Sequence, residues 1–160
     1  MSVEAFPASG TEQPTIHASA VLADGTGVLI RGASGSGKSS LVLALILADQ
    51  GRNRLIADDR VALTAYAGRL LAAPPPTLAG LVEIRGHGIV RLPYVAPQEI
   101  GLLVDFEPAA DFVRMPEGAA RTARLCGVDI PRLALPIGHP DGWIRVRAVL
   151  MAGRPRAGEH

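Results

Sequence analysis

Apolar and polar positions divide the chain into short segments of alternating type. Within residues 15–32, two apolar segments flank a turn at Asp24-Gly25, which predicts two short strands. The second segment is a compact apolar run that ends in glycine, as is typical of a buried strand. Residues 38–51 then combine helix length with good helix-forming residues and close on Gly51, which predicts a helix.

The rest of the chain continues this pattern. Residues 54–59 predict a short strand, and residues 61–76 a hairpin that turns near Ala67-Gly68. Residues 80–92 predict a strand or a turn broken by glycines, and residues 99–107 a further strand. Residues 119–138 are mixed and predict a short helix and a strand, while residues 142–153 fit a helix and also alternate like a strand. We expect one α/β domain at 15–152, between an arm at 1–14 and a tail at 153–160.

The composition narrows the class of protein. With 160 residues, 48% hydrophobic and 19% charged, the chain has the length and composition of one globular domain. A net charge of +1 argues against binding nucleic acid or anionic membranes by bulk electrostatics. Cys126 is the single cysteine, so neither an intrachain disulfide nor a cysteine-based metal site is expected. Neither a signal peptide nor an apolar run of membrane-spanning length is visible, which favours the cytoplasm.

The segment GASGSGKS fits the phosphate-binding pattern G-x-x-x-x-G-K-[ST] in full. It follows a predicted strand and opens a predicted helix, which is the context that this pattern requires. Its glycines allow several backbone N–H groups to point at one phosphate, beside the partial positive charge of a helix N-terminus. The residues predicted to bind the nucleotide are Gly32, Ala33, Ser34, Gly35, Ser36, Gly37, Lys38 and Ser39. Lys38, the only lysine of the chain, would neutralise phosphates, and the Ser39 hydroxyl would hold Mg²⁺.

Two adjacent acids, Asp58 and Asp59, end the strand predicted at residues 54–59. One acid could support the metal, and the other could accept a proton from an attacking hydroxyl. The sequence does not decide which acid has which role. A GTPase is disfavoured because the pattern NKxD is absent and because the D-x-x-G at Asp24 precedes the phosphate loop.

The segment LVEIRGHGIV closely resembles the signature of the HPr kinase/phosphorylase family of bacterial serine protein kinases. IADD at 56–59 and IPRLALPI at 130–137 resemble two further family motifs, in the family's order. The resemblance runs from Thr15 to Met151, is to a short form limited to the kinase domain, and implies a P-loop kinase fold like that of phosphoenolpyruvate carboxykinase. That fold has a mixed sheet with few helices.

The resemblance also implies roles for particular residues. Glu83 would bind the metal beside Ser39, and Arg85 would face the same site. His17 would lie near the transferred phosphate or the acid pair, and Arg114 would match a functional arginine. Gly86 and Gly88 would allow a tight backbone path near the substrate. The implied reaction uses ATP and Mg²⁺ to phosphorylate a serine of the phosphocarrier HPr, and the implied assembly is a hexamer.

Three departures from the family pattern keep alternatives open. The N-terminal domain that is usual in the family is not expected here, because the resemblance begins close to the start of the sequence. The loop after the signature is short, and PIGHPDGW at 136–143 lacks the two arginines of a family motif linked to dephosphorylation. These departures argue against the reverse reaction, in which inorganic phosphate attacks phosphoserine and yields pyrophosphate. They also argue against the hexamer of the family. The alternatives are a P-loop kinase of a small molecule and a nucleotide-sensing regulator without catalysis.

Overall fold

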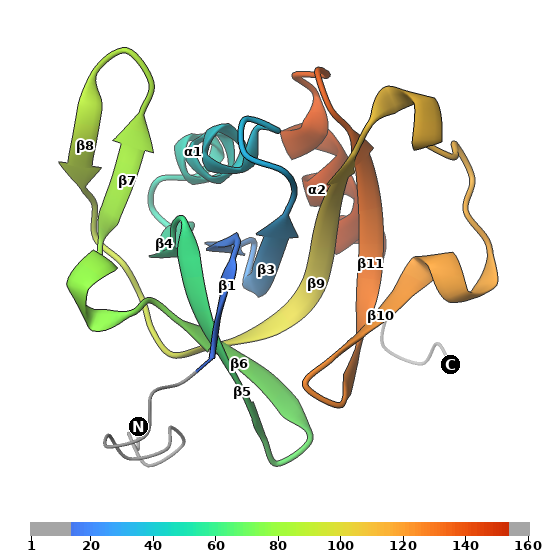
Figure 1. Ribbon diagram of the computed structural model, residues 1–160, viewed down its shortest axis with the longest axis horizontal. Coiled ribbons are helices and arrows are strands. Elements are labelled where there is room, and N and C mark those ends of the chain that lie inside the picture. The colour runs from blue at the N-terminus through green and yellow to red at the C-terminus, as the bar shows by residue number, and fades with distance from the viewer. Residues whose placement is uncertain (1–13, 154–160) are drawn as a thin grey trace.

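A curved mixed sheet of nine strands forms the body of this computed structural model, which describes residues 14–153 (Figure 1). Seven strands lie side by side in the spatial order β1 (Thr15–His17), β5 (Arg60–Tyr66), β6 (Arg69–Ala73), β9 (Gln98–Glu107), β3 (Thr26–Arg31), β2 (Ser19–Ala23) and β4 (Arg54–Ala57). β11 (Val128–Pro136) also pairs with β9, and β10 (Thr122–Leu125) pairs with β11. The β3–β9 and β9–β11 pairs are parallel, so the sheet is mixed as predicted.

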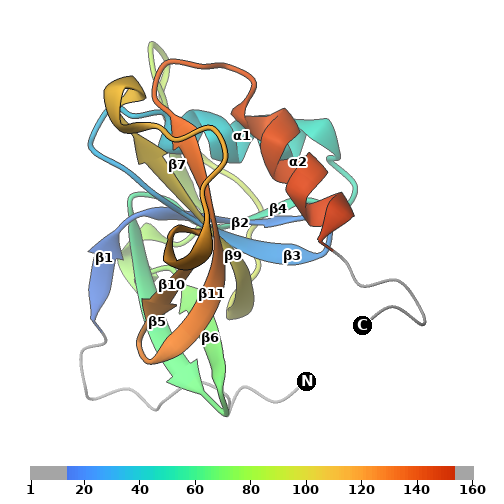
Figure 2. The same ribbon diagram turned by 90° about the vertical axis from the view of Figure 1, so that its right-hand side faces the viewer.

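Two helices lie on one face of this sheet, α1 (Lys38–Ala48) and α2 (Gly142–Ala152) (Figure 2). Both were predicted, and α2 is a helix rather than the alternative strand. Arg147 anchors α2 by donating to both carboxylate oxygens of Asp24, at 3.0 and 3.2 Å, in the turn between β2 and β3. Short 3₁₀ turns occupy η2 (Pro76–Leu78), η3 (Ala109–Asp111) and η4 (Gly118–Arg121). None of the helices in the described part of the chain is long and apolar enough to cross a membrane.

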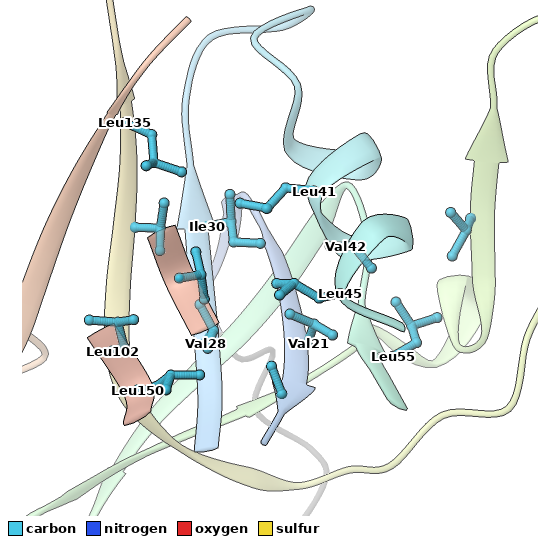
Figure 3. Close-up of a cluster of buried hydrophobic side chains, with 14 residues drawn as sticks. Val21, Val28, Ile30, Leu41, Val42, Leu45, Leu55, Leu102, Leu135 and Leu150 are labelled. Atoms are coloured by element: carbon cyan, nitrogen blue, oxygen red, sulfur yellow. The ribbon is translucent and has the colours of Figure 1, made fainter. Parts of the chain in front are cut away.

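The central strands are buried on both faces, which explains their continuous apolar sequence. Val28 and Ile30 of β3 face the helices and pack with Leu41, Val42 and Leu45 of α1 (Figure 3). We call this cluster the helix-side core. Leu29 of β3 points to the opposite face, into a second cluster with buried residues of β2, β4, β5, β6 and β9. We call this the opposite-face core. It fills the concave side of the curled sheet, where β2 approaches β5 and β4 approaches β6.

The structure corrects two of the predicted segments. Residues 15–31 hold three strands rather than two, because β1 leaves β2 and pairs with β5. Residues 119–138 begin with the 3₁₀ helix η4, in line with the predicted short helix, but then hold two strands instead of one. These are the hairpin β10–β11, which turns at Cys126 and Gly127 with φ angles of 50° and 80°. A non-glycine residue with positive φ gives little sequence signal, so this turn was not predicted. The arm predicted at 1–14 and the tail predicted at 153–160 lie outside the described residues, apart from Pro14 and Gly153.

Residues 80–92 form a separate two-stranded hairpin of β7 (Leu81–Ile84) and β8 (Gly88–Arg91), beside α1 and apart from the main sheet (Figure 1). Only one side of it is buried: Val82 packs into the helix-side core, whereas Glu83 and Ile89 are exposed. The two charges in this apolar segment therefore lie on an exposed hairpin and not inside a buried strand.

Candidate active site

The phosphate-binding pattern forms a tight loop between the end of β3 and the start of α1. Gly35 and Gly37 have φ angles of 81° and 116°, a region that glycine enters without steric cost. A methyl group at Gly32 would lie 2.5 Å from Ser36 Oγ and 2.9 Å from Phe106 Cβ, so only glycine fits there. The loop is thus folded closely in front of the N-terminus of α1, as binding of phosphate requires.

Lys38 is the first residue of α1 and is only 7% exposed. Its ammonium group donates to the carbonyl oxygens of Gly32 and Ala33 at 2.8 and 3.1 Å, so it lies under the loop. Burial lowers the pKa of Lys38, and the nearby carboxylates of Asp58 and Asp59 partly oppose this effect. A buried cation with no carboxylate hydrogen-bonded to it is suited to meet an incoming anion.

Asp58, at the end of β4, is 5% exposed and accepts hydrogen bonds from two serines. Ser19 Oγ donates to its Oδ1 at 2.6 Å, and Ser39 Oγ donates to both carboxylate oxygens at 2.9 and 3.0 Å. The carboxylate therefore fixes the Ser39 side chain by accepting the hydrogen bond of its hydroxyl, which leaves the lone pairs of the hydroxyl oxygen for a metal ion.

Asp59 is placed quite differently from its neighbour. Its side chain is 67% exposed, and its Oδ1 lies 3.5 Å from Nδ1 of His17 on β1. The backbone turns sharply here, because the Arg60 N–H donates to the Asp58 carbonyl at 2.8 Å and Asp59 has a φ of 71°. Such a three-residue turn is rare and strained, and strain of this kind gathers at functional sites. The turn directs one acid inward and the next outward.

The β7–β8 hairpin brings the carboxylate of Glu83 and the guanidinium of Arg85 beside the phosphate loop. Glu83 lines the cavity together with Lys38, Ser39 and Asp59. A methyl group at Gly35 would lie 3.5 Å from Nη2 of Arg85, so the guanidinium lies against the phosphate loop. The hairpin turn is made with φ angles of 84° at Gly86 and 132° at Gly88, which glycine adopts freely.

These groups surround one cavity of about 370 Å³, which we call the phosphate cavity. Its chemically active lining residues are His17, Lys38, Ser39, Asp59, Glu83 and Arg85. An adjoining cavity of about 290 Å³ is lined by Ser39, Asp58, Asp59 and Glu83. Arg114 is exposed in the segment between η3 and η4 and is not part of either lining. Its predicted role stays a prediction.

The model of one protein family, the HPr Serine kinase C-terminal domain, matches residues 9–142 of the chain. The chain belongs to the HPr kinase family. It is 36% identical over 134 residues to the HPr kinase/phosphorylase of Lactobacillus acidophilus, an alignment that covers 77% of this chain and 40% of that protein. The HPr kinase/phosphorylase of Mycoplasma mycoides is 45% identical over 73 residues, which are 46% of this chain and 22% of that protein.

A solved structure agrees with this assignment. The fold matches the Hpr(Ser) kinase/phosphatase from Coxiella burnetii with a TM-score of 0.72 and 29% identity, over 88% of this chain and all of that one. The predicted fold of an HPr kinase domain is therefore confirmed. The chain spans about two fifths of the length of the Lactobacillus acidophilus relative.

The donor set of this kinase domain fits magnesium bound together with phosphates. Ser39, Asp58 and Glu83 offer hard oxygen atoms, which Mg²⁺ prefers. Among residues 14–153, however, there is no group of three or more His, Cys, Asp or Glu side chains that could hold a metal by themselves. This is the usual situation for Mg²⁺, which takes one or two carboxylates and completes its shell with water and substrate phosphates.

Sequence reasoning missed two groups around this site. Ser19 is fully buried on β2, and the only signal for it was a hydroxyl at an apolar position of a strand. The other is a charged cluster behind the phosphate loop. Arg31 donates to both oxygens of Asp105 at 2.8 and 2.9 Å, and Arg132 donates to Asp105 at 2.7 Å and to Glu107 at 2.6 Å.

Proposed function

We propose that this protein transfers the γ-phosphate of ATP to a serine hydroxyl of an HPr-like phosphocarrier protein in the cytoplasm. The observation that carries the proposal is the phosphate cavity, which is lined by the phosphate loop, the buried Lys38, the Ser39 hydroxyl and the exposed carboxylate of Asp59. The acceptor is inferred from the family. The relatives are named HPr kinase/phosphorylase, and the matching family model is named for an HPr serine kinase.

Binding of the triphosphate with Mg²⁺ is supported by the loop. Lys38 and the N-terminus of α1 supply positive charge, and Arg85 lies against Gly35. Ser36 Oγ is buried and has no hydrogen-bond partner among the described residues, which is an arrangement suited to a loop that closes on an anion. Ser39 and Glu83 would hold the metal, with Asp58 behind Ser39.

Asp59 would be the general base. Asp58 is buried and engaged by two serine hydroxyls, so it cannot reach a hydroxyl of a docked protein, whereas Asp59 is exposed at the mouth of the cavity. The acceptor serine would give its proton to Asp59 as its oxygen bonds to the γ-phosphorus and the bond to the β-phosphate oxygen breaks, releasing ADP. His17 at 3.5 Å would orient Asp59, and most of the rate enhancement would come from positioning and charge neutralisation.

The first experiment is transfer from γ-labelled ATP to purified HPr-type carriers in the presence of Mg²⁺. Wild type is compared with Lys38→Ala and Asp59→Asn, and with Asp129→Asn as a control on the exposed β10–β11 hairpin, outside the cavity. We expect a labelled carrier serine with wild type and the control, and loss of label with the first two variants.

Two other outcomes decide between the alternatives. ATP binding without labelling of any carrier would contradict the proposal and favour a nucleotide-sensing regulator. Labelling of a small hydroxyl compound instead of a carrier would favour a small-molecule kinase. Addition of inorganic phosphate to the labelled carrier tests the reverse reaction, which the missing arginines of residues 136–143 make the weaker expectation.

A further inference from the structure

Ser19 is a buried polar residue beside the active site to which the proposed reaction gives no part. It is the first residue of β2, is fully buried, and is followed in that strand by apolar residues alone. A hydroxyl at such a position is costly to bury unless it finds a hydrogen-bond partner. Its partner is the carboxylate of Asp58, which Ser19 Oγ reaches at 2.6 Å, and Ser19 also belongs to the wall of the phosphate cavity.

The pairing of two strands brings this hydroxyl to the carboxylate. β2 and β4 run antiparallel, with Ala20 aligned with Ala57. The residue before the one and the residue after the other, Ser19 and Asp58, therefore lie opposite each other. Side chains alternate along β2, and Val21 packs in the helix-side core, so Ser19 points to the face on which α1 begins.

Two hydroxyl groups hold the Asp58 carboxylate. In the described part of the chain, Ser19 and Ser39 are the only side chains that donate hydrogen bonds to it. The bond from Ser19 has the short length of a charge-assisted O–H···O⁻ bond, whereas the one hydrogen of Ser39 is shared between the two carboxylate oxygens at 2.9 and 3.0 Å. The torsion that rotates an Asp carboxylate is soft, so without Ser19 only the weaker, shared bond would set its orientation.

We propose that Ser19 is a positioning residue for the Ser39 hydroxyl and acts through the Asp58 carboxylate. Held by Ser19, the carboxylate keeps the Ser39 hydrogen turned toward itself, so the lone pairs of the Ser39 oxygen stay available to a divalent cation in the phosphate cavity. The inference rests on the proposed binding of a nucleotide with such a cation. It adds a residue that contacts neither of them and still governs how well the cation binds.

The first test measures metal binding and needs no catalysis. Mn²⁺, which accepts oxygen ligands as Mg²⁺ does, is titrated into the whole protein with ADP, and free Mn²⁺ is measured by electron paramagnetic resonance against a blank of ADP alone. We expect Ser19→Ala to weaken Mn²⁺ binding by about 10- to 100-fold, the usual effect of removing a group that supports a metal ligand. Ser19→Thr keeps the hydroxyl and should restore binding close to that of wild type.

Two controls separate positioning from folding. Thr64→Ala removes a hydroxyl from β5 of the same sheet, outside both cavities that Ser39 lines, and should bind Mn²⁺ like wild type. Binding of ADP in the presence of EDTA, followed by calorimetry, should be the same in wild type and in all these variants. If Ser19→Ala lowers the thermal midpoint but leaves Mn²⁺ binding unchanged, Ser19 is merely structural and the proposal is overturned.

A double variant tests whether Ser19 acts through Asp58. If it does, Ser19→Ala has nothing left to disturb in an Asp58→Asn background, so the double variant should bind Mn²⁺ like Asp58→Asn alone. An additional loss equal to that of Ser19→Ala in wild type would overturn this route. If Ser19→Ala does not fold, Ser19→Cys takes its place, since a thiol has similar size and is a weak donor. Ser19→Cys should also weaken Mn²⁺ binding, and unchanged binding would contradict the proposal.

The outcomes distinguish this inference from the proposed function. If Ser19→Ala weakens Mn²⁺ binding as expected but wild type labels no carrier, the kinase proposal fails and the positioning role stands. If wild type labels a carrier and Ser19→Ala binds Mn²⁺ normally, only the positioning role fails. If wild type with ADP takes up no Mn²⁺ beyond the ADP blank, both proposals fail.

Discussion

At the scale of single residues, the site depends on two neighbouring acids that the backbone separates. Asp58 is buried and bonded to Ser19 and Ser39, while Asp59 is exposed beside His17. The tight turn at Asp59, with its φ of 71°, produces this difference between consecutive residues. Identical side chains one position apart therefore have different partners and different exposure.

This separation predicts opposite phenotypes for the two amide variants. Asp59→Asn removes the proton acceptor and keeps the side-chain size, so transfer should fall by about 10²- to 10⁴-fold while ATP binds as in wild type. Asp58→Asn disturbs the support of Ser39, so it should raise the Mg²⁺ concentration needed for half-maximal rate. Single-turnover transfer and ATP binding, measured over a Mg²⁺ series, separate the two. A large rate loss at saturating Mg²⁺ in Asp58→Asn alone would assign the base to Asp58 instead.

The buried charge of Lys38 is expected to lower the stability of the folded protein. Burial lowers its pKa in the folded state, so the folded protein holds this proton less tightly than the unfolded chain does. Stability therefore rises with pH as it increases from the folded pKa toward the unfolded value of about 10.4. We expect Lys38→Met to be more stable than wild type near pH 7, by a margin that shrinks toward pH 10.5, and to lose ATP binding. Thermal unfolding at a series of pH values measures the margin; a margin that widens with pH would contradict this explanation.

At the scale of elements, an ionic cluster joins the strands behind the phosphate loop. Arg31 of β3, Asp105 of β9 and Arg132 of β11 meet there, and Arg31 directly precedes the loop. Burial alone would raise the pKa of Asp105, but hydrogen bonds from Arg31 and Arg132 outweigh it and lower that pKa. The cluster thus ties the base of the loop to two parallel strands.

Removal of the shared acid should weaken all three strands. Asp105→Asn takes the carboxylate partner from Arg31 and leaves Arg132 paired with Glu107 alone, and we expect a loss of about 2–4 kcal/mol in the free energy of unfolding at pH 7. Because the folded pKa is lowered, the contribution of Asp105 exists above about pH 4 and disappears as the pH falls further. Urea unfolding at pH 7 and at pH 3 measures the difference, which should shrink at pH 3. Asp129→Asn, in an exposed pair with Arg124, is the matched control and should cost under about 1 kcal/mol.

How much the sequence predicts depends on how local the information is. The strand, loop and helix at residues 27–48 are contiguous and carry their signals in order, so they were predicted correctly. Ser19 and Asp58 are 39 positions apart and Arg31 and Asp105 are 74 apart, so no local pattern contains either contact. The different surroundings of Asp58 and Asp59 follow from the backbone angle at Asp59 and from the burial of Asp58, which the residue types do not encode.

At the scale of the whole molecule, the two cores share their strands. Along β3, Val28 and Ile30 enter the helix-side core while Leu29 enters the opposite-face core, and β9 alternates in the same way at Leu102 and Leu103. A change in one core must move strands that also line the other. Both cores should therefore unfold together, although α1 and α2 cover only one face.

One pair of matched substitutions tests this coupling. Ile30→Val lies in the helix-side core and Ile56→Val in the opposite-face core, and both isoleucines are fully buried. Each should cost about 0.5–1.5 kcal/mol. Unfolding in urea is followed by Trp143 fluorescence, which reports on the helix side, and by far-ultraviolet circular dichroism, which reports on all elements. We expect each variant to shift both signals equally, in a single transition. If Ile56→Val shifted the circular dichroism and left the Trp143 transition in place, the two faces would be separate folding units, and the site on the helix side would be stable without the opposite-face core.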